Sequence, residues 1–182
     1  MRAGRLRYRG QVLSLDDQLQ PVVLGSRWVD IRTKEGETPA PLGLRQRSLV
    51  EIRARFSEVF RSGRYLRHGD RLFHLVSPRD PRGNGVEVVV SAEELIGAPA
   101  TYTAQPGAEP LLCRVFLDYE VARPGQFGGM VEYATQLEAA LIEVGRPQPG
   151  AVFLVDGVRW RVAGLVERED DRVVRRMWVK RI

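Results

Sequence analysis

The sequence predicts a mainly β protein made of two small β-barrel modules, with long loops and at most a short helix in each. Three observations lead to this prediction. Apolar and polar residues alternate with a period of two along most of the chain. Turn-forming glycine, proline and aspartate residues recur between the alternating stretches. A segment rich in proline and glycine divides the 182 residues near their middle. Many short strands separated by turns are typical of sandwiches and barrels.

The alternation is clearest between residues 50 and 56. Every second side chain there is apolar, and those between are charged or polar. One face of this strand is therefore expected to be buried and the other to be in solvent. The side chains expected in the core are Val50, Ile52, Ala54 and Phe56. Further strands are predicted at residues 6–12, 28–31, 85–90, 152–155, 158–162 and 173–179.

Turns and irregular segments separate these strands. Asp156-Gly157 joins two short alternating runs and predicts a tight hairpin, because both residues accept the left-handed conformations of a type I′ turn. Lys34–Gly43 is rich in Gly, Pro, Thr and Glu and predicts a long exposed loop. Met130–Val144 has helical spacing, although residues 131–135 fit a strand equally well, and the sequence leaves this choice open.

The proline-rich segment predicts the domain organisation. Residues 97–110 contain three prolines and two glycines and almost no large apolar side chains, which is typical of a linker. Residues 1–96 and 111–182 would then be separate modules, each large enough to fold by itself. Both modules end in the same series of glycine turn, strand, charged turn and closing strand. This weak internal repeat suggests two related barrels.

The net charge of +5 belongs entirely to residues 1–100, because residues 101–182 are neutral. Four arginines crowd the start of the chain: Arg2, Arg5, Arg7 and Arg9. Such asymmetry suggests that the first module contacts an anionic partner, either DNA or an acidic protein ring. A solvated arm without a partner is the alternative.

The chemistry-bearing residues do not form a catalytic pattern. The one cysteine, Cys113, lies in an apolar run and is expected to be buried. His68 and His74 have no cysteine near them that would suggest zinc. His68 and Asp70 have no nucleophile motif beside them. We expect no enzyme, no cofactor and no metal.

No apolar run approaches the roughly 20 residues that a membrane span needs. The basic N-terminus is not followed by the apolar region of a signal peptide. We therefore expect no membrane segment, and we expect the protein to stay in the cytoplasm of the cell that makes it.

The first half resembles the head-closure, or head–tail adaptor, proteins of long-tailed phages, also called connector or stopper proteins. The likeness covers residues 1–95. It consists of a basic opening segment at 1–9, a strand around Trp28, the arginine-rich strand 50–56 and the turn Gly69-Asp70-Arg71.

The second half, residues 111–182, resembles the head–tail joining proteins of lambda-type phages. Gly150, an apolar run ending in Val155-Asp156-Gly157-Val158, and then Trp160-Arg161-Val162 carry this likeness. Neck proteins of both groups usually have one domain, so a chain with both leaves open which module faces the head.

The resemblance implies a structural protein of the virion neck, assembled in the host cytoplasm. Such proteins form rings, commonly six-fold, between the DNA-filled head and the tail, and they help to retain packaged DNA. The implied partners are other copies of the chain, a portal or adaptor ring on the head side, and a tail terminator or tail tube on the tail side. Contact with packaged double-stranded DNA is also implied.

Two glycine-containing loops would suit docking in such a ring. The residues expected to dock are Lys34, Glu35, Gly36 and Glu37 in the first loop and Gln126, Phe127, Gly128 and Gly129 in the second.

Two alternatives remain. The first is a basic nucleic-acid-binding β-barrel, for which Phe56, Phe60 and Tyr65 near several arginines would supply base-stacking aromatics. The alternation assigns Phe56 to the core, which counts against that interpretation. The second is a tail-terminator-type tail protein.

Overall fold

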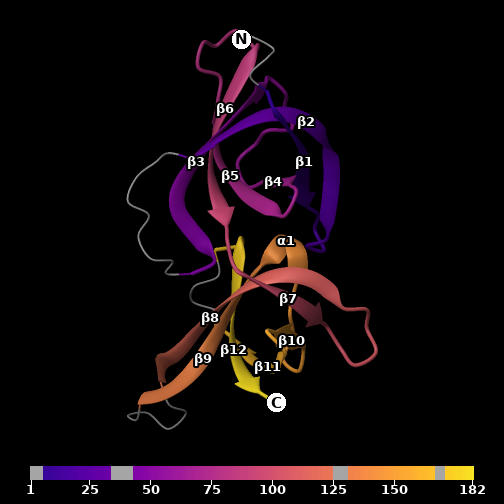
Figure 1. Cartoon of the computed structure of the whole chain (residues 1–182), viewed down its shortest axis with the longest axis vertical. Helices are drawn as coiled ribbons and strands as arrows, with labels where there is room; N and C mark the ends of the chain where they lie inside the picture. Colours follow the sequence, from indigo (N-terminus) through magenta and orange to yellow (C-terminus); the bar gives the residue numbers. More distant parts are fainter. Residues whose placement is uncertain (1–5, 34–42, 125–130, 167–170) are drawn as a thin grey trace. The chain divides into compact units, whose positions relative to one another are not determined.

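The computed structural model describes residues 6–33, 43–124, 131–166 and 171–182. The chain divides into two compact units, Met1–Ile96 and Gly97–Ile182. Each unit is a closed six-stranded barrel in which all neighbouring strands are antiparallel (Figure 1). The predicted fold class of two small β-barrels is confirmed.

The first barrel closes through its shortest strand. The sheet order is β1-β2-β3-β6-β5-β4, and β4 pairs back onto β1 at Gln11↔Arg67, Val12↔Leu66 and Leu13↔Tyr65. The strands are β1 (Tyr8–Leu15), β2 (Pro21–Thr33), β3 (Arg45–Arg55), β4 (Tyr65–His68), β5 (Arg71–Arg79) and β6 (Glu87–Leu95).

The second barrel repeats this plan. Its order, β10-β11-β12-β9-β8-β7, is the order of the first barrel once the strands are counted from β7. The elements are β7 (Ala98–Thr103), β8 (Leu111–Pro124), β9 (Val131–Ala140), α1 (Leu141–Val144), β10 (Val152–Val155), β11 (Val158–Leu165) and β12 (Val174–Arg181). The repeat noticed in the sequence is therefore a repeat of whole-barrel topology.

Corresponding hairpins in the two barrels show which residues of the repeat align with each other. Asp156-Gly157 joins β10 to β11, with φ of 48° and 78°, as a type I′ turn requires. In the first barrel, Gly69-Asp70 joins β4 to β5 at the same place in the topology, and only Gly69 has positive φ. Gly69-Asp70 thus corresponds to Asp156-Gly157 in the topology.

Two segments differ from the sequence expectations. The linker predicted at 97–110 is wrong for Ala98–Thr103, because these residues form β7 and pair with both β8 and β10. Pro99 fits in this strand because it stands next to its beginning. The open choice at Met130–Val144 resolves into strand β9 followed by the single-turn helix α1.

Each barrel has its own core. Val50, Ile52 and Ala54 are buried among apolar side chains of the first barrel, as the alternation predicts. The prediction for Phe56 is wrong, since its side chain is 46% exposed. The reason is that β3 ends at Arg55, and the chain leaves the sheet before the alternation reaches Phe56.

The second barrel contains a nearly buried ion pair next to Cys113. The Arg114 guanidinium lies 3.0 Å from the Glu143 carboxylate, which also accepts the backbone N–H of Arg114 at 3.0 Å. These bonds fix α1, which carries Glu143, against β8. Burial, assisted by the negative charge of Glu143, raises the pKa of the Cys113 thiol to about 12.

No helix in the part of the chain that the structure describes is long and apolar enough to cross a bilayer.

The first prediction concerns the Asp156-Gly157 hairpin. Gly157→Ala should lower the free energy of unfolding by about 1 kcal/mol, because an L side chain at φ 78° is strained. Gly164→Ala is the matched control, since a Cβ at Gly164 meets nothing within 4 Å and its φ is not positive. Urea unfolding of both variants checks this. Equal stability of the two variants would contradict the assigned turn.

The second prediction concerns Cys113. At pH 8 the folded protein should react with iodoacetamide roughly three orders of magnitude more slowly than an exposed thiol of ordinary pKa, because the thiolate is the reacting form. Ala163→Cys supplies an exposed thiol in the same barrel for comparison. Mass spectrometry before and after urea unfolding measures the difference. Rapid labelling of native Cys113 would show that the thiol is accessible.

Candidate functional site

The outer wall of the first barrel carries ion pairs between neighbouring residues of the same strand. Asp30 and Arg32 on β2 form an ion pair at 2.8 Å, and Glu51 and Arg53 on β3 form another at 2.7 Å. The hydrogen bond to Glu51 raises the pKa of Arg53 above its ordinary value. Opposite charges therefore lie next to each other on this solvent-exposed part of the wall, as is common on exposed strand faces.

The next position along these strands, at Trp28, lacks such ion pairs among the described residues. Arg9 on β1 stands directly opposite Trp28 on β2. Val29 pairs with Ala54, so the next position along the ladder brings Arg55 of β3 beside Trp28 on its other side. The tryptophan is 56% exposed between two strands that each contribute an arginine.

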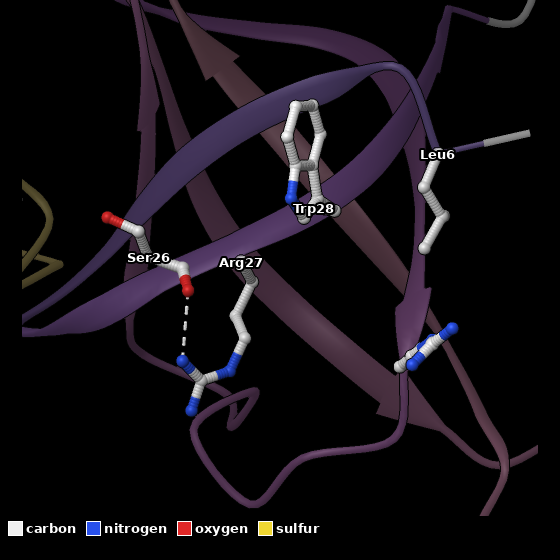
Figure 2. Close-up of a pocket in the computed structure, with 5 residues that line it drawn as sticks. Leu6, Ser26, Arg27 and Trp28 are labelled. Carbon is white, nitrogen blue, oxygen red and sulfur yellow. Dashed lines mark hydrogen bonds between the residues drawn. The ribbon is translucent and has the colours of Figure 1, made fainter. Parts of the chain in front are cut away.

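A cavity of about 450 Å³ opens beside this tryptophan. We call its lining together with Arg9 the Trp28 surface; it consists of Leu6, Arg9, Ser26, Arg27, Trp28 and Arg55. Figure 2 shows the indole of Trp28 standing away from the strand, with the side chain of Leu6 on one side. The Arg27 guanidinium turns back and donates a hydrogen bond to the Ser26 carbonyl at 2.9 Å (Figure 2).

The Trp28 surface is left positive. Within the described part of the chain, Arg9, Arg27 and Arg55 make no ion pair, although Glu87 faces Arg55 across the β3–β6 ladder. Tryptophan and arginine are the residues most enriched where proteins bind other proteins. Exposed cations around an apolar cavity suit an anionic partner that also presents an apolar side chain.

The predicted N-terminal arginines fall partly on this surface. Arg7 and Arg9 are both exposed, and the Arg7 backbone N–H donates to the Val29 carbonyl at 3.1 Å, which extends the β1–β2 ladder. Arg2 and Arg5 lie outside the described residues. The structure therefore brings Arg9, but not the whole set, beside Trp28.

Both histidines pack against tyrosine rings. His68 packs against the Tyr8 ring at 5.0 Å between centroids, and its Nδ1 lies 3.1 Å from the Arg9 carbonyl oxygen. His74 is nearly buried, packs against the Tyr65 ring at 5.4 Å between centroids, and has its Nδ1 3.5 Å from the Glu93 carboxylate. Among the described residues, no group of three or more His, Cys, Asp or Glu side chains could hold a metal ion.

In the second barrel, β8 and β9 continue as a two-stranded ribbon (Figure 1). β8 pairs with β7 only as far as Val115, and β9 pairs with β12 only as far as Thr135. From Val121↔Ala134 onward, β8 and β9 therefore pair only with each other. Near the end of the ribbon, Arg123 forms an ion pair with Glu132 at 2.6 Å and lies over the Trp178 ring. β8 ends at Pro124, and β9 begins at Val131.

The expected docking residues cannot be placed on these elements. Those of the first loop (Lys34, Glu35, Gly36 and Glu37) and those of the second (Gln126, Phe127, Gly128 and Gly129) all lie outside the described residues.

The β8–β9 register shifts between Asp118 and Val121, just before the two-stranded ribbon begins. Glu120 has a positive φ of 58°, and the three residues Asp118, Tyr119 and Glu120 are exposed. The Tyr119 ring meets the Trp160 ring edge-on at 6.1 Å and remains 59% exposed. We call Asp118–Glu120 the acidic bulge.

A second apolar area lies on the wall of the same barrel. Leu112 on β8 and Leu154 on β10 flank Thr101 of β7, and Leu112 is 84% exposed. A cavity of about 600 Å³ lies nearby, lined in part by Arg159 and Arg161. This area offers apolar contact with a basic border.

Sequence reasoning missed Trp28 and Tyr119 as surface features, and it placed Arg55 on the solvent face of its strand without linking it to Trp28. Trp28 precedes Val29, and the period of two that buries Val29 already turns Trp28 outwards. The signal for Tyr119 was an aromatic residue between two acidic ones. Of the aromatics considered for base stacking, Phe60 and Tyr65 are buried, and only Phe56 is exposed.

Comparison with known proteins gives one family. The model of the Phage Head-Tail Attachment protein family matches residues 86–179, which run from the start of β6 through almost all of the second barrel. A search of curated proteins found no match. The matched residues make up just over half of the chain and agree with the resemblance to head–tail joining proteins. Proteins of this family are structural components of the phage neck that contact head and tail parts, and they are not an enzyme family. The chain belongs to the phage head-tail attachment protein family.

Proposed function

We propose that the protein forms a six-fold ring in the neck, joins the DNA-filled head to the tail, and helps to retain the packaged DNA. The observation that carries this proposal is the family match over residues 86–179. Two closed barrels in tandem support it, because closed sheets have few free edges and give rigid building blocks for a ring wall. A cyclic ring needs one surface that fits a different surface of the next copy.

The proposed neighbours follow from that position. A portal or adaptor ring would bind on the head side, and a tail terminator or tail tube on the tail side. The loops at 34–37 and 126–129 are proposed to dock in the assembled ring, with Phe127 as the apolar anchor. The likeness of residues 1–95 to head-closure proteins remains part of this proposal. Assembly would take place in the host cytoplasm before the protein enters the virion.

Nucleic-acid binding is a second candidate function, and one observation favours it. Phe56 and Trp28 are both exposed on the barrel that carries the whole net positive charge. Exposed aromatics beside unpaired arginines are typical of single-strand-binding barrels. Contact with packaged double-stranded DNA would use the arginines alone, because base faces are stacked inside a duplex.

The third prediction tests the neck function. Deleting the gene from the phage or prophage that encodes it should leave DNA-filled heads and complete tails that do not join. Electron microscopy of the lysate measures the joining, and nuclease sensitivity of the head DNA measures retention. Supplying the wild-type chain from a plasmid should restore whole particles with a ring in the neck. Normal virions from the deletion strain would contradict the proposal.

The fourth prediction tests DNA contact by the N-terminal arginines. Changing Arg2, Arg5, Arg7 and Arg9 to Ser should weaken binding to duplex DNA. It should also lower the slope of log affinity against log salt by about 0.9 for each phosphate that the arginines no longer neutralise. Arg79→Ser with Arg82→Ser removes exposed charges elsewhere on the same barrel and serves as the control. An unchanged slope in the quadruple variant would mean that these arginines do not contact DNA.

A further inference from the structure

The Trp28 surface has a complement within the same sequence. We propose that the Trp28 surface of one copy binds the acidic bulge, Asp118–Glu120, of a second copy, and that this contact links neighbouring subunits. The inference rests on the proposed ring and names the two surfaces that would meet in it.

The receiving side is a cavity with cations at its edge. Its volume of about 450 Å³ exceeds what an aromatic side chain needs, and the walls formed by Leu6 and Trp28 are apolar. Arg9 and Arg55 stand on either side of Trp28. Because neither arginine has an ion-pair partner in the described part of the chain, an incoming carboxylate would not have to displace one.

The inserting side has the opposite character. Tyr119 stands between two acidic residues in the sequence, and all three side chains are exposed. Within the described residues, neither Asp118 nor Glu120 forms an ion pair. The edge-on contact with Trp160 supports one side of the Tyr119 ring. A partly fixed aromatic anchor loses less conformational freedom on binding than a free one.

The two surfaces match in both charge and apolar character. Tyr119 would enter the cavity beside Trp28 as an aromatic pair, while Asp118 and Glu120 would approach Arg9 and Arg55. Since the two surfaces differ, the contact is heterologous, and repeated use of it either closes a ring or extends a filament.

Duplex DNA fits this surface less well than a second copy does. Phosphates would satisfy the arginines, but the stacked bases of a duplex leave the apolar cavity and the exposed indole of Trp28 without a partner. A protein segment that combines carboxylates with an aromatic ring uses every part of the surface.

Site-directed crosslinking of the full-length chain tests the contact. In a Cys113→Ala background, one copy carries Ser26→Cys at the Trp28 surface, and a second copy of different tag size carries Ala122→Cys near the acidic bulge. The two are mixed and treated with a short bismaleimide. The matched control replaces Ala122→Cys by Ala163→Cys, which is exposed on β11 of the same barrel.

The expected product is a covalent heterodimer with Ala122→Cys and none with Ala163→Cys. Adding Trp28→Ala to the first copy should weaken association roughly 30-fold, the loss typical of a central tryptophan. Arg9→Glu with Arg55→Glu should also abolish the heterodimer. Asp118→Arg with Glu120→Arg in the other copy should restore it, and because these side chains are exposed, circular dichroism should report wild-type folding throughout.

Several outcomes would overturn the proposal. One is equal crosslinking with Ala163→Cys, and another is failure of the charge swap to restore the heterodimer. A chain carrying both cysteines that crosslinks only within itself, at monomer size, would exclude a contact between copies. If the Trp28→Ala variant crosslinks as well as the wild type but binds DNA more weakly, the surface is a DNA-binding surface.

The experiments distinguish failure of the proposed neck function from failure of the proposed contact. If the heterodimer forms as described but the deletion strain joins heads to tails normally, the contact holds and the neck function is wrong. If necks contain a ring that Trp28→Ala and the arginine reversals leave intact, the neck function holds and the contact is wrong.

Discussion

Each barrel depends on the pairing that its fourth strand makes with its first. In the first barrel, β4 has only four residues, and three of their register positions pair with β1. Gly10 leaves room for the Leu66 side chain in this pairing, because a Cβ at Gly10 would lie 2.8 Å from Leu66 Cδ1. In the second barrel, β10 has the same length and pairs with β7 at four positions. Without these pairings, each sheet would have two open edges and an exposed core.

Closure also determines how the protein can bind others. A strand inside a closed barrel has both of its edges occupied, so partners must recognise outward side chains or the ribbon formed by β8 and β9. On the first barrel several outward charges are matched in pairs, as for Asp30 with Arg32. The row through Trp28 departs from this pattern. The interaction surface is therefore the part of the barrel wall where charged side chains have no ion-pair partner among their described neighbours.

The sequence was most informative where a pattern had a single physical explanation. Alternation placed Val50, Ile52 and Ala54 in the core, and Asp156-Gly157 predicted its hairpin, since few other structures tolerate two left-handed residues in a row. Composition misled at 97–110, because β7 is too short and too rich in small residues to differ from a linker. Its strand character comes from pairing with β8 and, at a much greater distance in sequence, with β10.

Single residues at strand ends were harder to predict. Phe56 continues the alternation of β3 but stands after its last residue, and no local signal marks that end. The candidate site was only partly foreseen. Arg9 was singled out for its charge, whereas Trp28 and Arg55 join it only through the register of β1, β2 and β3. Register is a property of paired strands, so a linear pattern does not reveal which side chains become neighbours.

The short passage from β6 to β7 has a mechanical consequence. Only Ile96 and Gly97 separate Leu95, the last residue of the first barrel's final strand β6, from Ala98, the first residue of the second barrel's first strand β7. A pull on either barrel therefore reaches the other without any slack backbone to be drawn out first. Tension along the chain between the barrels would load the hydrogen-bond ladders of β6 and β7 in series, and the weaker ladder would set the force that this junction can withstand.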